Sequence, residues 1–312
     1  TCEGSVTNNK KLKIMKTIKQ RISYAVMGLV AMGFTACTQN EDMTPTLKGQ
    51  EINATFSVGG MQTRVNTLGN GKNWEDKDKL KVTIFTDYDN GSTTFLSFNG
   101  ETWSRSGSFR WLNEYEKHTI LAVYPSDTDF GKNNLQYDLQ TDQSSEGNLK
   151  NADLITGYWY DIPLSYYVDI PMKHRMSLVT IVYHVGTADY PDMDISEPQV
   201  YSKNNSVRFF RAPDHGQLVM GTPSGNPDWV KACIHDDGMF SAIVIPGSYI
   251  KDERFLKFKI GDKNFYAKMK INTEFQEGQR YTYKLDVGKD IVKLTQISVD
   301  DLKGWTNEDD LK

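Results

Sequence analysis

The feature that most constrains the fold is a period-two alternation of apolar and polar residues, which recurs in short segments along the chain. It is clearest at residues 52–58, in Phe255–Ile260 and in Tyr281–Val287. Successive side chains of a strand point to opposite faces, so each of these segments predicts a half-buried β-strand. In the first segment the residues that would share the buried face are Ile52, Ala54, Phe56 and Val58.

Turn residues separate these segments. Asn90-Gly91 and Asn99-Gly100 suit the positive φ of tight hairpins, and Ile120–Tyr124 is nearly all apolar and ends at a proline, as a central strand does. Residues 130–150 are polar and predict a long loop with weak strands such as Leu135–Leu139. Aromatics make up 12% of the chain, and no long amphipathic helix interrupts the pattern, so we predict an all-β protein.

The N-terminal region predicts export. Lys16, Lys19 and Arg21 precede a short apolar run that ends in Phe34-Thr35-Ala36-Cys37. Such a run is too short for a permanent membrane span, and small residues before a cysteine form a lipobox, at which Cys37 becomes the lipidated N-terminus. The alternative is an ordinary secretory signal that ends near a chance cysteine. We expect translation to start at Met15, directly before the basic residues of this signal.

Length then predicts the domain organisation. Removing 36 residues from 312 leaves 276, which is long for one core and favours two β-sandwich domains in tandem. We predict an upstream segment and signal peptide at 1–36, a tether at 37–50, an N-terminal domain at 51–170 and a C-terminal domain at 171–312. Cys233 has no partner once Cys37 is lipidated, so stability must come from apolar burial.

Composition and motifs argue against several function classes. The net charge of −4 and the lack of a basic stripe make nucleic acid an unexpected partner. Nucleophile-elbow, zinc-protease and phosphate-loop motifs are missing, so we expect no enzyme, no cofactor and no metal. Cys233 and His235 could share one face beside Asp236-Asp237, but zinc needs three or four ligands, and a buried thiol is favoured.

Two further groups have both a functional and a structural interpretation. The aromatics Tyr158, Trp159 and Tyr160, with Tyr166-Tyr167, could stack on sugar rings, but core and edge packing is favoured because tyrosine is abundant throughout. His174-Arg175 could serve as a base or an anion site; a hydrogen-bonded structural pair is favoured.

A series of short motifs resembles, in order, the fimbrillin family of bacterial lipoprotein pilins. After the lipobox and its acidic tether, these are the strand before Thr63-Arg64, Trp74 with its acidic residues, Tyr124-Pro125, Thr141-Asp142-Gln143-Ser144, Ala152-Asp153-Leu154, His174–Val179, Gly278–Tyr283 and Trp305. The likeness spans nearly the whole mature chain.

The resemblance implies two transthyretin-like sandwiches in a lipoprotein of the outer membrane, displayed on the cell surface in fimbriae. It also implies that an arginine-specific protease cuts between Arg64 and Val65 and removes the first strand. A C-terminal strand of the next subunit would then fill the groove by β-augmentation, with its apolar side chains at Ile291, Leu294, Ile297 and Val299.

We therefore expect a structural subunit or a fimbria-associated adhesin. Its partners would be other fimbrillin subunits, the protease, and a host surface or other bacteria. The alternative is a surface glycan-binding lipoprotein that uses the Tyr158–Tyr160 aromatics.

Overall fold

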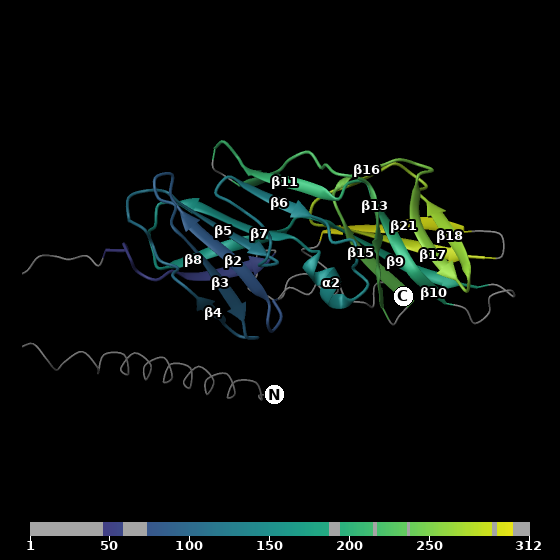
Figure 1. Ribbon diagram of the computed structural model, residues 1–312, viewed down its shortest axis with the longest axis horizontal. Helices are drawn as coiled ribbons and strands as arrows, with labels where there is room; N and C mark the ends of the chain where they lie inside the picture. Colours follow the sequence, from purple (N-terminus) through teal and green to yellow (C-terminus); the bar gives the residue numbers. More distant parts are fainter. Residues whose placement is uncertain are drawn as a thin grey trace, which may run out of the picture. The chain divides into compact units, whose positions relative to one another are not determined.

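The computed structural model describes residues 46–58, 74–186, 194–214, 217–235, 238–288 and 292–301 (Figure 1). The signal peptide, Cys37, most of the tether, the Arg64-Val65 bond, Asp236-Asp237, Ile291 and Trp305 lie outside these residues. The described residues form strands joined by turns, with one short helix, α2 (Glu146–Asn151). The prediction of an all-β protein is confirmed. Within the described segments, no helix has both the length and the apolarity needed to cross a membrane.

The first sheet contains seven strands in the order β1-β8-β7-β5-β2-β3-β4. Their bounds are β1 Asn53–Val58, β2 Lys79–Phe85, β3 Ser92–Phe98, β4 Trp103–Ser106, β5 His118–Tyr124, β7 Ile155–Asp161 and β8 Tyr167–His174. Both predicted hairpin glycines have positive φ, +61° at Gly91 and +92° at Gly100. A Cβ at Gly91 would lie 1.7 Å from the Ile84 carbonyl oxygen, so the turn between β2 and β3 accepts only glycine.

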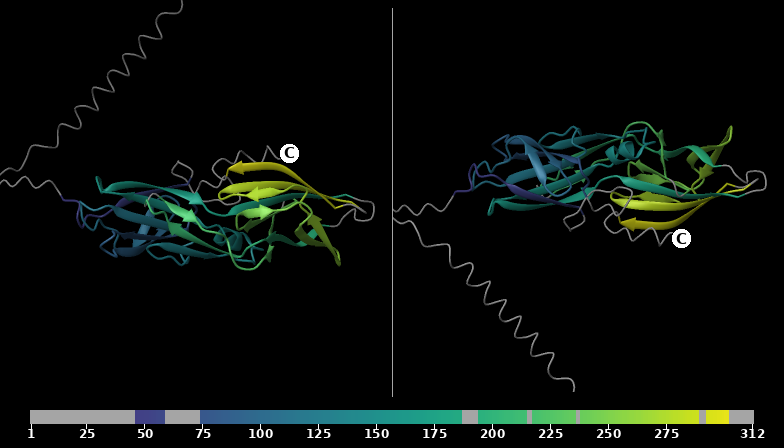
Figure 2. Two further views of the ribbon diagram at one scale, coloured as in Figure 1. Left: turned by 90° about the horizontal axis from the view of Figure 1, so that it is seen from above. Right: turned by 90° about the horizontal axis from the view of Figure 1, so that it is seen from below.

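The second large sheet has five strands in the order β14-β15-β9-β20-β21, and Figure 2 shows β20 and β21 side by side in yellow. Its strands are β9 Ser177–Val185, β14 Cys233–His235, β15 Met239–Val244, β20 Gln279–Val287 and β21 Val292–Asp301.

Three smaller sheets complete the fold, in the orders β13-β10-β17-β18, β12-β11-β6 and β16-β19. Their strands are β6 Asn134–Asp138, β10 Ile195–Ser202, β11 Ser206–Arg211, β12 Leu218–Met220, β13 Asp228–Lys231, β16 Gly247–Tyr249, β17 Arg254–Ile260, β18 Lys263–Lys268 and β19 Thr273–Phe275.

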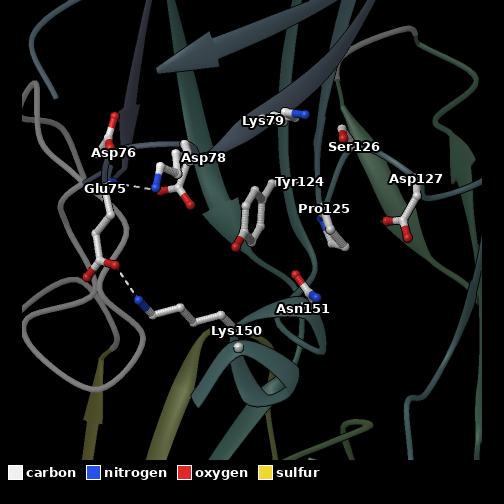
Figure 3. Close-up of a pocket in the computed structure, with 12 residues that line it drawn as sticks. Glu75, Asp76, Asp78, Lys79, Tyr124, Pro125, Ser126, Asp127, Lys150 and Asn151 are labelled. Carbon is white, nitrogen blue, oxygen red and sulfur yellow. Dashed lines mark hydrogen bonds and ion pairs between the residues drawn. The ribbon is translucent and has the colours of Figure 1, made fainter. Parts of the chain in front are cut away.

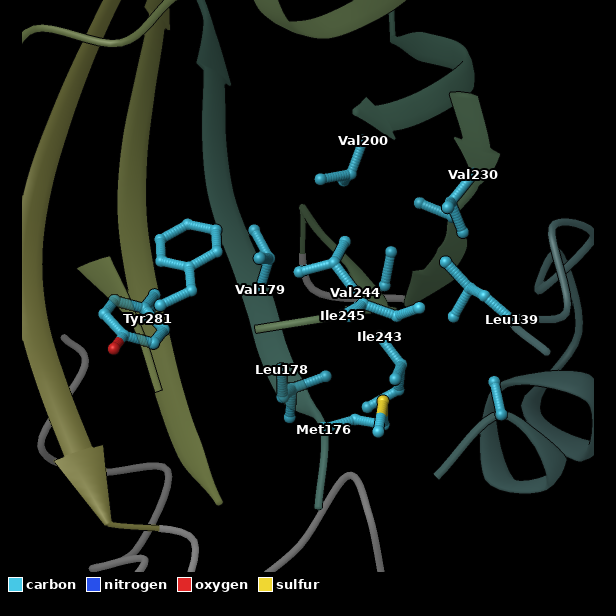
Figure 4. Packing of buried hydrophobic residues seen from close by; sticks show 14 of the residues in the cluster. Leu139, Met176, Leu178, Val179, Val200, Val230, Ile243, Val244, Ile245 and Tyr281 are labelled. Carbon is cyan, nitrogen blue, oxygen red and sulfur yellow. The ribbon is translucent and has the colours of Figure 1, made fainter. Parts of the chain in front are cut away.

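Two buried apolar clusters hold the sheets together. The first core contains Ile52, Phe56, Val58, Trp74, Leu80, Val82, Ile84, Leu96, Phe109, Trp111, Ile120, Ala122, Tyr124, Ile155, Val168, Ile170 and Met172. The second core is larger and runs from Leu121 to Leu294; Figure 4 shows part of it around Met176, Leu178, Val230 and Ile243. Strand β5 is buried on both faces because Ile120 and Ala122 face the first core while Leu121 and Val123 face the second.

The first sheet curls around its own core. Strands β1 and β4 are its two edges, yet Phe56 of β1 and Trp103 of β4 meet edge to face with ring centroids 5.6 Å apart. Just before β1, Glu51 forms ion pairs with Arg105 of β4 and with Arg110. The two edge strands β1 and β4 therefore meet along a line of contacts, here called the β1 seam, and β1 closes the first core along this line.

The predicted domain boundary at 170/171 falls inside β8, and only Arg175 and Met176 separate β8 from β9. Residues of both predicted domains contribute to the second core, including Leu135 and Leu149 from the first and Ile181 from the second. The division into two domains stays a prediction.

Candidate functional site

The strand predicted to be removable lies at the edge of the first sheet. β1 pairs with β8 in parallel, from Asn53 opposite Tyr167 to Val58 opposite Met172. The Asn53 amide donates to the Tyr166 carbonyl at 2.8 Å, at the start of this pairing. An edge strand has only one sheet neighbour, so exchanging it would break one ladder rather than two.

The inward face of β1 matches the predicted alternation. Ile52, Phe56 and Val58 are buried members of the first core, and Ala54 packs partly against it. The opposite face carries two hydroxyls that meet one carboxylate: Thr55 Oγ1 donates to Asp169 Oδ1 at 2.8 Å, and Ser57 Oγ donates to the same oxygen at 3.3 Å. Asp169 lies on β8, so the pairing of the two strands is supported by both backbone and side chains.

Trp74 contacts both strands of the seam, β1 and β4. Its indole Nε1 donates to the Phe56 carbonyl oxygen at 2.8 Å, and this bond is buried. Its ring packs edge to face against Trp103 at 5.2 Å and against Tyr124 at 5.9 Å between centroids. Trp74 thus connects the β1 backbone to the aromatic centre of the first core.

A cavity of about 450 Å³ is lined by Glu75, the residue after Trp74, and by Asp78 and Tyr124 among others; Figure 3 shows its lining residues, with the Tyr124 hydroxyl pointing into it. Lys150 of α2 forms an ion pair with Glu75 across the cavity. Burial raises the pKa of Asp78 to about 6, although Asp78 accepts a hydrogen bond from the Glu75 amide. No group of three acidic, histidine or cysteine side chains suited to a metal occurs among the described residues.

The predicted donor strand forms another edge. β21 pairs antiparallel with β20 at the end of the five-stranded sheet, with an irregularity in register opposite Thr282 and Tyr283. Leu294 is buried in the second core, whereas Ile297 and Val299 are 49% and 47% exposed. The structure therefore separates the predicted apolar positions: Leu294 stabilises its own subunit, and the other two described positions face outward.

The aromatics considered for sugar binding do not share one face. Tyr158 packs against the second core, while Trp159 packs against the first and lies 5.4 Å from the Trp111 ring. Lys117 lies over the Tyr160 ring at 5.1 Å. Adjacent residues of β7 point to opposite sides of the sheet, and all three side chains are half-buried. The glycan-binding alternative stays a prediction without a common aromatic platform at this strand.

The other sequence candidates have structural partners. His174 Nδ1 lies 2.8 Å from Asp153 Oδ2, and Arg175 contacts Glu277 at 2.9 Å and the Leu218 carbonyl oxygen at 3.0 Å. Burial lowers the pKa of Arg175. Cys233 is buried in the second core, which confirms the buried thiol, and burial raises its pKa.

The sequence from residue 63 to residue 301 is similar to that of a known protein family. A sequence model described as fimbrillin-like matches residues 63–301. The chain belongs to the fimbrillin-like family. No protein with a curated description matches the sequence of this fimbrillin-like protein.

Solved structures share the fold. One is a candidate cell adhesion protein from Bacteroides uniformis, 14% identical, with a TM-score of 0.58; the match covers 84% of this chain and all of that one. Another, from Bacteroides ovatus, is also a candidate cell adhesion protein with 14% identity and a TM-score of 0.58, over 83% of this chain and 99% of that one. At this identity the likeness establishes the fold of this fimbrillin-like protein.

Sequence reasoning missed the roles of three residues that hold β1: Asp169, Trp74 and Trp103. Asp169 alternates with Val168 and Ile170 in β8, a pattern that places its carboxylate on the outward face. The roles of Trp74 and Trp103 carry no local signal, because they depend on the curling of the sheet.

Proposed function

We propose that this fimbrillin-like protein is a cell-surface fimbrial subunit or fimbria-associated adhesin that assembles by strand exchange at β1. The observation that carries the proposal is the position of β1: it is an edge strand, yet its inward side chains complete the first core. Removing it would uncover the faces of Val168, Ile170 and Trp103 against which these side chains pack. A replacement strand would regain that burial.

The size of this term supports strand exchange as a driving force. Ile52, Phe56 and Val58 are each at most 3% exposed. Burying such a side chain is worth roughly 1.5–3 kcal/mol, so three of them offer about 5–9 kcal/mol of gross burial to an incoming strand. Backbone bonds to β8 would add specificity of register.

Strand β21 matches part of the β1 pattern, at the positions of Phe56, Ser57 and Val58. If Ile297 of the next subunit took the place of Phe56, Val299 would take the place of Val58, and Ser298 would replace Ser57 beside Asp169. Ile297 and Val299 are half exposed, so these two side chains would lose little burial in their own subunit, whereas Leu294 of the same strand would have to leave the second core or stay behind in it. We propose this register for the incoming strand.

The remaining steps rest on the family resemblance. Cys37 would carry the lipid that holds the monomer at the outer membrane, and cleavage between Arg64 and Val65 would free β1 from Trp74 and the rest of the chain. The partners are an arginine-specific protease and further subunits; an adhesin would also bind a host surface or other bacteria.

Replacing Arg64 tests the proposal. Mass spectrometry of surface material should find Val65 as the wild-type N-terminus and lipidated Cys37 in both Arg64→Ala and Arg64→Lys, since lysine keeps the charge but not the protease site. Both variants should stay monomeric in denaturant-resistant ladder gels, while Lys72→Ala assembles normally. Normal polymer from either Arg64 variant would overturn the proposal.

A further inference from the structure

Four large apolar side chains of this protein are mostly exposed to solvent. Within the described ranges, Tyr88 is 89% exposed, Leu164 87%, Tyr167 74% and Tyr115 72%, and the next large apolar side chain, Ile250, is 57% exposed. Single exposed apolar residues are common on protein surfaces, but several of them gathered in one place mark an interaction surface. The place of these four in the fold therefore decides what they mean.

Strand pairing brings all four to the same end of the first sheet. β1 begins opposite the first residue of β8, β5 begins opposite the last residue of β7, and β2 ends opposite the second residue of β5. The loops that follow β2 and β7 and the segments that precede β1 and β5 therefore meet at one end, here called the entry end. Tyr88 lies in the β2–β3 turn, Tyr115 before β5, Leu164 between β7 and β8, and Tyr167 at the start of β8.

Hydrogen bonds join the segments of the entry end. Trp111, in the segment before β5, donates from its indole Nε1 to the Ser165 carbonyl oxygen at 3.0 Å, next to Leu164. The Trp111 carbonyl oxygen accepts from the Gly49 amide at 2.8 Å, in the chain that leads to β1. The segment before β5, the β7–β8 loop and the start of the described chain therefore form one continuous surface.

The chain that leads back to the predicted lipid anchor leaves from this surface. Thr46 Oγ1 and the Leu47 amide both donate to the Glu114 carboxylate, next to Tyr115. Cys37 lies nine residues before Thr46. An extended chain spans at most about 3.6 Å per residue, so a lipid on Cys37 would hold Thr46 within about 32 Å of the bilayer surface. The anchor would thus bring the entry end, rather than another part of the first sheet, close to the membrane.

We propose that the entry end rests on the lipid bilayer and that its four exposed apolar side chains enter the interfacial region. This proposal rests on the lipidation of Cys37 in the proposed function and does not depend on strand exchange. Tyrosine suits the interface because its ring is apolar while its hydroxyl stays hydrated among the headgroups, and the Leu164 side chain is purely apolar. The contact adds a second attachment to the lipid and fixes the orientation of the monomer.

The charge of the entry end selects the kind of lipid surface. In the β2–β3 turn and in the segment before β5, an acidic residue lies on each side of the exposed tyrosine, and Lys48 and Lys117 offset part of this charge. An anionic surface would repel these carboxylates at low ionic strength. The entry end therefore fits a zwitterionic phospholipid surface better than an anionic one.

Fluorescent labels on single cysteines test the contact. We would attach the dye NBD to Leu164→Cys or Tyr115→Cys in the lipidated full-length protein, with Arg64→Ala to keep the tether on the chain, in phosphatidylcholine vesicles. Lipids with a nitroxide near the headgroup should quench most of the fluorescence of either label. A label at Glu101→Cys, exposed in the β3–β4 turn at the other end of the first sheet, should keep its fluorescence.

Labelling is specific to the new cysteine. Cys233 is buried, Cys37 would carry the lipid, and Cys2 precedes the expected translation start. All three labelled positions are exposed, so the label should not disturb the fold.

The rate at which the lipidated protein moves between vesicles measures the strength of the contact. Leu164→Ser with Tyr115→Ser should speed transfer to acceptor vesicles about tenfold, because two interfacial side chains no longer hold the protein. Ile250→Ser with Ile271→Ser removes two exposed apolar side chains elsewhere and should leave the rate unchanged. Adding phosphatidylglycerol to the vesicles at low salt should speed transfer of the wild type.

Three outcomes would overturn the proposal. Unquenched labels at both positions, in protein whose Cys37 is lipidated by mass spectrometry, would overturn it and leave the proposed function standing. An unlipidated Cys37 would remove the anchor from the proposed function and this proposal with it. Labels that are shielded only at high protein density, and not quenched by nitroxide lipid, would assign the surface to a second copy of the chain instead of lipid.

Discussion

Asp78 lies in the turn that follows Trp74, and its protonation state affects folding stability. Its carboxyl is largely buried between the 75–78 turn and Tyr124, and its pKa rises to about 6 from an ordinary value near 4. Because the folded state holds the proton more tightly than the unfolded state, folding stability falls as pH rises from about 4 to about 6. The loss of stability is complete by about pH 7, roughly one unit above the folded pKa of Asp78.

We predict that Asp78→Asn removes this dependence. At pH 7 the variant should be more stable than the wild type by about 1 kcal/mol, allowing for partial solvent screening, and the two should converge below pH 4. Urea unfolding between pH 3.5 and 8 measures the difference. Asp142→Asn gives the opposite sign as a control, since hydrogen bonds from Ser144 and Lys231 lower the pKa of Asp142 to about 2. Parallel curves for wild type and Asp78→Asn would contradict the prediction.

Trp74 supports β1 through a single donor. Trp74→Phe keeps an aromatic ring near Trp103 and Tyr124 but loses the N–H that bonds the Phe56 carbonyl. We expect a loss of about 1 kcal/mol, concentrated in β1. Amide hydrogen exchange should accelerate in residues 53–58 and stay unchanged in β9; Trp229→Phe, which lies beside Tyr201, should leave β1 protected. Uniform acceleration would contradict a local role.

At the scale of elements, the two edge strands differ in what their apolar residues do. Ile297→Ser with Val299→Ser should leave the monomer Tm nearly unchanged, because both side chains are already half exposed, but should reduce polymer in ladder gels. Leu294→Ala should instead destabilise the monomer by about 2–5 kcal/mol. Unchanged assembly of the double variant would remove β21 from the proposed role.

Strand identity was predictable from local pattern, and strand partners were not. The alternation at 52–58 and the apolar run at 120–124 are local signals, and both strands occur as expected. The partner of β1 lies 114 residues away, from Asn53 to Tyr167, and nothing local encodes that choice. The short helix α2 falls within the predicted loop, although its Ser145 N-cap, bonded by the Asn148 amide, is a sequence signal that could have been used.

The candidate site at β1 was also predictable only where local sequence patterns determine it. The inward residues of β1 were predicted by their period, while the hydroxyl pair on Asp169 and the Trp74 bond depend on tertiary contacts. Strand periodicity puts Tyr158 and Trp159 on opposite faces of β7, which adds to the compositional argument for packing over a shared sugar-binding face.

At the scale of the whole molecule, β5 couples the two cores. Ile120 is buried in the first core and Leu121 in the second, so unfolding of β5 would disrupt both cores at once. We predict one unfolding transition. Tryptophan fluorescence, dominated by Trp74, Trp103, Trp111 and Trp159 around the first core, should coincide with the far-ultraviolet circular dichroism of all strands. Separate midpoints would show that the predicted domains unfold independently.

The parallel pairing of β1 with β8 has a mechanical consequence. A pull along the strand axis loads all six paired positions in shear, whereas a pull across the sheet would open them one after another. A replacement strand in the same place would inherit this geometry. Since β8 passes through two residues into β9, at the middle of the five-stranded sheet, tension that reaches the seam continues along one short stretch of backbone into the centre of the second core.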